Sequence, residues 1–132
     1  MIGVGATLPP LVIDVTPTFV VSTALATRDF QDVHHDRDLA QARGSKDIFV
    51  NILTDTGLVQ RFVTDWAGPS ALIRQISIRL GVPCYAYETL TFTGHVASTV
   101  EEDGETRYVI EVVGRNSLGD HLTGTVRLAM AS

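Results

Sequence analysis

The chain has 132 residues, of which 45% are hydrophobic, and its net charge is −5. This length fits one domain over 1–132, and ten scattered lysines and arginines exclude a protein that binds nucleic acid through clustered basic residues. One cysteine, Cys84, excludes a disulfide framework, and without a leader or a long uncharged run we expect a cytoplasmic protein with no membrane partner.

The first predicted elements are a strand, a helix and a polar loop. The apolar run Leu11–Val15 predicts a short strand. Thr16 and Pro17 are residue types of an N-cap and a first helical position, so they predict a helix over about Pro17–Thr27. The segment Gln31–Asp36 is polar and non-periodic, which indicates a loop.

A short helix is predicted next, over Asp36–Arg43, and Gly44 ends it. Asp36 is assigned to the N-cap of this helix because a carboxylate there accepts backbone N–H groups. The Asp29–Gly44 segment therefore places polar residues on a loop held between helices, a common arrangement for catalytic groups.

A long helix is predicted from the spacing of apolar residues at offsets of three and four, with Ile48 and Val50 adding to its apolar character. Such a helix is largely buried. The residues that carry the spacing are Phe49, Ile52, Leu53, Thr56, Val59, Val63 and Trp66.

From Ala71 onward the hydrophobic period changes to two, which predicts four antiparallel strands. The single sheet must receive the apolar face of the helix, so we expect an α+β fold with an antiparallel sheet wrapped around a long central helix. An edge strand and part of the helix stay uncovered, which favours pairing with another subunit. Three of the strands are expected over Glu88–Ser98, Thr106–Arg115 and His121–Ala131, joined by Asp103-Gly104 and Asn116–Gly119.

Asp29 and His34 are the candidate catalytic residues. The imidazole of His34 takes or gives a proton near neutral pH, and Asp29, five residues earlier, can converge with it across a loop on one water molecule. An isolated pair of this kind recurs by chance. Here the pair is part of a longer pattern, Asp-x4-His-x-Asp-x3-Ala-x3-Gly, which runs from Asp29 to Gly44.

This longer pattern resembles the hydratase motif of the MaoC-like, (R)-specific enoyl-CoA hydratases, a family with the hot-dog fold. The resemblance implies a hot-dog fold and the addition of water to a 2-enoyl-CoA thioester. It also implies that Asp29 and His34 hold that water. No cofactor is implied, since coenzyme A is part of the substrate.

Two segments, Ala24–Asp36 and Asn51–Gly57, are more closely similar to the small subunits of actinobacterial steroid side-chain enoyl-CoA hydratases. This resemblance implies a partner, a larger MaoC-like subunit, in an α2β2 assembly. It also implies a steroid substrate with a short unsaturated acyl-CoA side chain.

The chain departs from the family pattern at two places. Where the family has Asn-Pro, this chain has Gln31-Asp32, and the Gln31 amide is predicted to bind the water. Where the family has His-Gly, it has Val50-Asn51, and the backbone N–H groups at Val50 and Asn51 are the predicted oxyanion donors, at the start of the long helix.

Other polar residues are assigned structural roles. A metal site at His34, His35 and Asp36 is not expected, because neighbouring side chains in an extended segment point to opposite sides. His95 and His121 are predicted on the sheet surface, and Cys84 is predicted to be a buried, inert thiol.

Two alternative functions stay open at this point. A hot-dog thioesterase would attack the thioester carbonyl and release free coenzyme A. A non-catalytic subunit would only complete the pocket of its partner, but the presence of both Asp29 and His34 argues against it.

Overall fold

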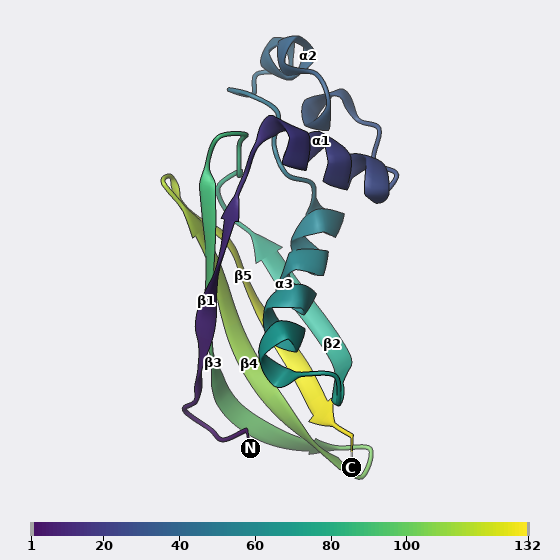
Figure 1. Ribbon diagram of the computed structural model, residues 1–132, viewed down its shortest axis with the longest axis vertical. Coiled ribbons are helices and arrows are strands. Elements are labelled where there is room, and N and C mark those ends of the chain that lie inside the picture. The colour runs from purple at the N-terminus through teal and green to yellow at the C-terminus, as the bar shows by residue number, and fades with distance from the viewer. Residues whose placement is uncertain (1, 132) are drawn as a thin grey trace.

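The computed structural model describes residues 2–131, which form one antiparallel sheet and a set of helices (Figure 1). The strand order in the sheet is β1-β3-β4-β5-β2. The elements are β1 (Thr7–Asp14), α1 (Pro17–Ala26), the 3-10 turn η1 (Asp32–His34), α2 (Arg37–Ala42), α3 (Ile52–Ala67), β2 (Ala71–Leu80), β3 (Thr89–Glu102), β4 (Glu105–Asn116) and β5 (Gly119–Met130).

The sheet curves around α3, so the predicted α+β architecture with a central helix is confirmed (Figure 1). The helix buries one face against the sheet, and the Phe62 ring lies 5.9 Å from that of Phe92 on β3, measured between ring centroids. The buried apolar side chains of α3 are Leu58, Val59, Phe62 and Val63, and those facing them from the central strands include Leu90, Phe92, Val96, Ile110, Val112, Leu122 and Val126.

Close approach of α3 to the sheet depends on Gly94 in β3. A Cβ atom at this position would lie 2.8 Å from the Glu111 carbonyl oxygen and 3.0 Å from Cε2 of Phe62. The missing side chain therefore leaves the space into which the Phe62 ring packs.

The first strand is longer than the predicted Leu11–Val15. It spans Thr7–Asp14 and includes Pro9 and Pro10 at a register shift between Leu8 and Leu11. Because β1 is an edge strand, a proline here need not remove a ladder hydrogen bond, which explains why a residue type that usually ends strands is tolerated.

The long helix begins at Ile52, so the prediction that it includes Phe49 was wrong. Phe49 forms an isolated antiparallel bridge with Tyr85. On either side of this bridge, the Val50 N–H donates to the Cys84 carbonyl at 3.0 Å and the Ala86 N–H donates to the Ile48 carbonyl at 2.9 Å. Residues 48–50 are therefore a short extended segment and not the first turn of the helix.

The capping predictions for the two shorter helices are confirmed. The Thr16 hydroxyl accepts the Phe19 N–H at 3.0 Å at the start of α1. The Asp36 carboxylate accepts the Leu39 N–H at 3.1 Å at the start of α2. The last three strands occur where predicted, although β3 and β4 continue to the tight turn at Asp103-Gly104.

The short helices α1, η1 and α2 gather beyond the N-terminal end of α3, at one end of the sheet (Figure 1). This arrangement brings the loop after α1 next to the start of α3. Within residues 2–131 no helix is both long and apolar enough to cross a membrane.

Candidate active site

Asp29 is positioned by the end of α1. Arg28 adopts a left-handed conformation with φ 57°, and the Asp29 N–H donates to the Ala24 carbonyl at 2.9 Å, which closes the helix. The Oδ1 atom of Asp29 then accepts the Gln31 N–H at 3.3 Å, as in an Asx turn. Oδ1 is thus engaged in a local hydrogen bond, and Oδ2 remains available to residues farther along the chain.

His34, at the end of η1, is buried and held by Phe49. Its Nδ1 atom lies 2.7 Å from the Phe49 carbonyl oxygen, and the two rings meet edge to face with centroids 4.9 Å apart. A carbonyl oxygen only accepts hydrogen bonds, so Nδ1 must carry the hydrogen. In the neutral ring, Nε2 is therefore the free acceptor.

The structure brings the two predicted residues together. Nε2 of His34 lies 3.4 Å from Oδ2 of Asp29. With neutral His34 and ionised Asp29, two acceptors face each other, and one molecule with two O–H bonds can donate to both. The arrangement can therefore orient a water molecule and take a proton from it.

Asn51 adjoins this pair through its side chain. Its Nδ2 atom donates to Oδ2 of Asp29 at 3.2 Å and to the Thr27 hydroxyl at 2.8 Å. Its Oδ1 atom accepts the Thr54 hydroxyl in a short hydrogen bond. Both Asn51 and Thr54 are buried, so the network is shielded from solvent.

Of the predicted oxyanion donors, only Asn51 is free to act. The prediction for Val50 was wrong, because its N–H is used by the Cys84 carbonyl in the extended segment that precedes α3. Among the described residues the Asn51 N–H has no acceptor. It lies at the N-terminal end of a 16-residue helix, where the helix dipole is positive.

Gln31 lies away from the pair. Its side chain is exposed and borders a small cavity of about 250 Å³ together with Asp32, Val33 and Arg43. Only its backbone N–H contacts Asp29. The structure therefore does not bring the Gln31 amide to the place where the acceptor atoms of Asp29 and His34 face each other.

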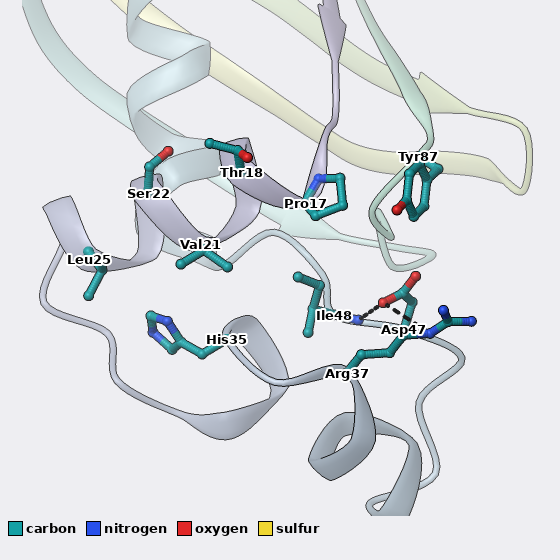
Figure 2. A pocket seen from close by; sticks show the side chains of 10 residues that line it. All are labelled: Pro17, Thr18, Val21, Ser22, Leu25, His35, Arg37, Asp47, Ile48 and Tyr87. Carbon is teal, nitrogen blue, oxygen red and sulfur yellow. Dashed lines mark hydrogen bonds and ion pairs between the residues drawn. The ribbon is translucent and has the colours of Figure 1, made fainter.

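A larger apolar cavity of about 480 Å³ lies between α1 and the segment around Ile48 (Figure 2). Ile48 lines it, while the next residue, Phe49, packs on His34. Consecutive side chains of an extended segment point to opposite sides, so this cavity and the Asp29–His34 pair lie on opposite sides of the segment. Its other lining residues are Pro17, Thr18, Val21, Ser22, Leu25, His35, Arg37, Asp47 and Tyr87.

The prediction that His121 lies on the sheet surface was wrong. The ring is buried, its Nε2 lies 2.9 Å from both carboxylate oxygens of Asp55 on α3, and its Nδ1 lies 2.6 Å from the Val82 carbonyl. Burial raises the pKa of Asp55 despite the hydrogen bond from His121. Burial alone would lower the pKa of His121. The hydrogen bonds of the ring to Asp55 and to the Val82 carbonyl outweigh this effect, so the pKa of His121 is raised above its usual value.

Because both nitrogens of His121 face acceptors, the folded pair keeps one proton between Nε2 and Asp55.

The assignments of Cys84 and His95 agree with the structure. Cys84 is fully buried, and burial raises its pKa to about 11. His95 is exposed, 3.4 Å from Glu111. Among residues 2–131, no three His, Cys, Asp or Glu side chains gather as metal ligands would.

Sequence reasoning missed three groups at this site: the Thr27 and Thr54 hydroxyls and the Phe49 carbonyl. A signal for Thr54 was present in the sequence, since Asn51 and Thr54 are three residues apart at a helix start, a spacing typical of side-chain contacts there. No local signal exists for Phe49, because its carbonyl meets His34 across 15 residues.

A comparison with curated proteins finds a relative that is 69% identical over 130 residues and matches 98% of each chain. It is the beta subunit of 3-oxo-4,17-pregnadiene-20-carboxyl-CoA hydratase from Mycobacterium tuberculosis. No family model matches the chain.

Solved structures with the same fold include the ChsH1-ChsH2 complex from Mycobacterium tuberculosis, with a TM-score of 0.92 and 68% identity, covering 98% of this chain and 99% of that one. The R-hydratase PhaJ1 from Pseudomonas aeruginosa has a TM-score of 0.87 at 15% identity, covering 99% and 83%. The (R)-hydratase from A. caviae has a TM-score of 0.86 at 17% identity, covering 98% and 97%. These last two likenesses establish the fold.

Proposed function

The chain belongs to the MaoC-like hydratases with the hot-dog fold, and from this premise we propose that it is the catalytic subunit of a steroid side-chain enoyl-CoA hydratase. The substrate class follows the 69% identical relative, which is named for a steroid carboxyl-CoA. The reaction adds water across the 2,3 double bond of the enoyl-CoA thioester.

The observation that carries the proposal is the 3.4 Å separation between Nε2 of His34 and Oδ2 of Asp29. A water molecule that donates one hydrogen to each acceptor has its oxygen lone pairs free to attack the β-carbon. As the carbon–oxygen bond forms, the Asp29–His34 pair takes one proton from the water and gives one proton to the α-carbon, so the pair ends in the protonation state in which it began. The reaction consumes one water and leaves no other product than the hydroxyacyl-CoA.

The negative charge that collects on the thioester oxygen needs a donor. We assign this role to the Asn51 backbone N–H, which has no acceptor among the described residues and lies at the positive end of the α3 dipole. Loss of one such donor typically costs about 10²- to 10³-fold in kcat.

The surface beside this site suggests where a partner subunit sits. Phe30, next to Asp29, is 69% exposed, and Ile52 and Leu53, next to Asn51, are 50% and 55% exposed. Large apolar side chains grouped in this way are typical of protein interfaces. We propose that a larger MaoC-like subunit covers them in an α2β2 assembly. The similar solved structure, a ChsH1-ChsH2 complex, supports the presence of a partner subunit.

Hydration is redox-neutral, so we propose that the enzyme uses no cofactor besides the coenzyme A of its substrate. We also place it in the cytoplasm. The free, buried thiol of Cys84 agrees with a reducing compartment.

The test is a product assay on the chain co-expressed with its partner subunit. With a steroid enoyl-CoA, mass spectrometry should show a gain of one water and a thiol reagent should show no free coenzyme A. Crotonyl-CoA serves as the comparison substrate and should be hydrated more slowly. Release of free coenzyme A without a hydrated product would mean thioester hydrolysis and would refute the proposal.

A further inference from the structure

We infer that the side chain of Asn51 is a positioning residue that fixes the carboxylate of Asp29 toward His34. The inference rests on the proposed function and concerns the side chain alone, separately from the backbone N–H of the same residue. It adds a polar network of Thr27, Asn51 and Thr54 to the two catalytic residues.

Every hydrogen-bonding group of this amide has a partner. One N–H of Nδ2 points to the Thr27 hydroxyl at 2.8 Å and the other to Oδ2 of Asp29 at 3.2 Å, while Oδ1 accepts the Thr54 hydroxyl. An amide with all its groups engaged cannot rotate without losing bonds, and Asn51 is only 3% exposed. The position of its donor toward Asp29 is therefore fixed.

The Asn51 side chain also does not make the hydrogen bond that is usual at an N-cap position. An asparagine at the N-cap normally accepts a backbone N–H from the first turn of its helix, which stabilises the helix. Here the side chain makes no such bond and instead contacts Asp29, 22 residues earlier in the chain. The side chain of Asn51 thus orients the Asp29 carboxylate, and the first turn of α3 is left without a side-chain cap.

The same oxygen, Oδ2 of Asp29, receives the Asn51 donor and faces Nε2 of His34. A second bond holds Oδ1 to the Gln31 N–H. With both oxygens bonded, the plane of the carboxylate is set, so a reacting water meets the acceptor in one orientation. Misplacement of a reacting group by about 1 Å can cost about 100-fold in rate.

The experiment measures kcat and KM of Asn51→Ala in the complex with the partner subunit, on a steroid enoyl-CoA. We expect kcat to fall about 10- to 100-fold with KM within about twofold of wild type. The alanine retains the backbone N–H, so the oxyanion donor is kept. A raised KM with unchanged kcat would show a substrate contact and overturn the inference, as would unchanged values of both.

A matched pair at Thr54 tests the same network without altering Asn51. Thr54→Ser keeps the hydroxyl and should retain wild-type kcat, whereas Thr54→Val has the same shape without the donor and should lower kcat about 3- to 30-fold at unchanged KM. Equal kcat for the two variants would overturn the inference. This test remains valid even if Asn51→Ala does not fold. Asp29→Asn, assayed in parallel, separates the two hypotheses, because its full activity would refute the proposed function itself.

Discussion

His34 donates its Nδ1 hydrogen to the carbonyl oxygen of Phe49 over 2.7 Å, and this bond decides which nitrogen faces Asp29. The carbonyl belongs to the extended segment that also pairs with the chain at Tyr85. The orientation of the imidazole is therefore set by backbone that is itself fixed in the fold. A side chain without an acceptor atom at the same place should leave the water without one of its two acceptors.

We predict that His34→Ala and Asp29→Asn each lower kcat/KM by about 10²- to 10⁴-fold while the chain stays folded. His34→Ala removes one of the two acceptors for the water, and Asp29→Asn replaces the charged carboxylate by an amide that cannot take a proton. Steady-state kinetics measure the loss, and circular dichroism with a thermal melt checks the fold. His95→Ala is the matched control, since His95 is exposed on the sheet and should keep wild-type activity. A fully active His34→Ala enzyme would end the hypothesis.

The buried pair of His121 and Asp55 predicts a pH dependence of stability. The pKa of His121 is raised above 6.5 in the folded chain, so folding retains a proton that the unfolded chain loses. The resulting stabilisation is complete below the unfolded pKa of 6.5 and is lost as the pH rises through the raised value. Its limiting slope is about 1.4 kcal/mol per pH unit.

Urea unfolding followed by Trp66 fluorescence between pH 6 and pH 9 measures this slope. Asp55→Asn keeps the shape of the side chain and removes the negative charge that retains the proton on His121, so the decline above pH 6.5 should become shallower. His95→Ala should show the wild-type slope. The same decline in Asp55→Asn as in wild type would mean that another group carries the pH dependence.

Cys84 should resist thiol reagents in the folded protein. Its side chain is fully buried and burial raises its pKa to about 11, so at pH 8 almost none of the reactive thiolate is present. Ellman's reagent should react with the thiol only as fast as the chain unfolds, and at once in denaturing urea. Rapid reaction in native buffer would show that the segment next to Val50 opens readily.

The sequence predicts the architecture well because the periods of two and of three to four are local consequences of which face is buried. It fails at Phe49 and Val50, where the helical spacing continues backward by chance and the true pairing with Tyr85 lies far along the chain. Periodicity carries no information about such a distant partner. The predicted helix therefore starts too early. For the same reason Val50 is wrongly predicted to supply an oxyanion donor.

The prediction that His121 lies on the sheet surface is wrong for a different reason. Strict alternation along the last strand assigns it to the surface, but a register shift between Gly114 and Arg115 lies opposite the start of β5, and His121 and Leu122 are both buried. A bulge of this kind changes which face a residue occupies. The spacing of Asp29 and His34 belongs to a motif, so the sequence predicts this pair. The contacts of the Asn51 side chain belong to no motif, and only the fold brings them together.

The apolar surface beside the site is expected to bind the partner subunit. Leu53, in the first turn of α3, is 55% exposed and directly follows Asn51 and Ile52. If the larger subunit covers this surface, a charge there must be buried without a partner, which costs several kcal/mol. Leu53→Glu should therefore abolish co-purification with the partner and lower the activity of the mixture, while the isolated chain keeps its helix content.

Val4→Glu is the matched control, because Val4 is 62% exposed and precedes β1 in the sequence. The start of β1 lies at the end of the sheet away from α1 and α2 (Figure 1). It should co-purify with the partner as wild type does. Size-exclusion chromatography of the co-expressed subunits compares the two variants. An intact complex with Leu53→Glu would place the interface elsewhere, since a buried glutamate at its centre cannot be accommodated without loss of affinity.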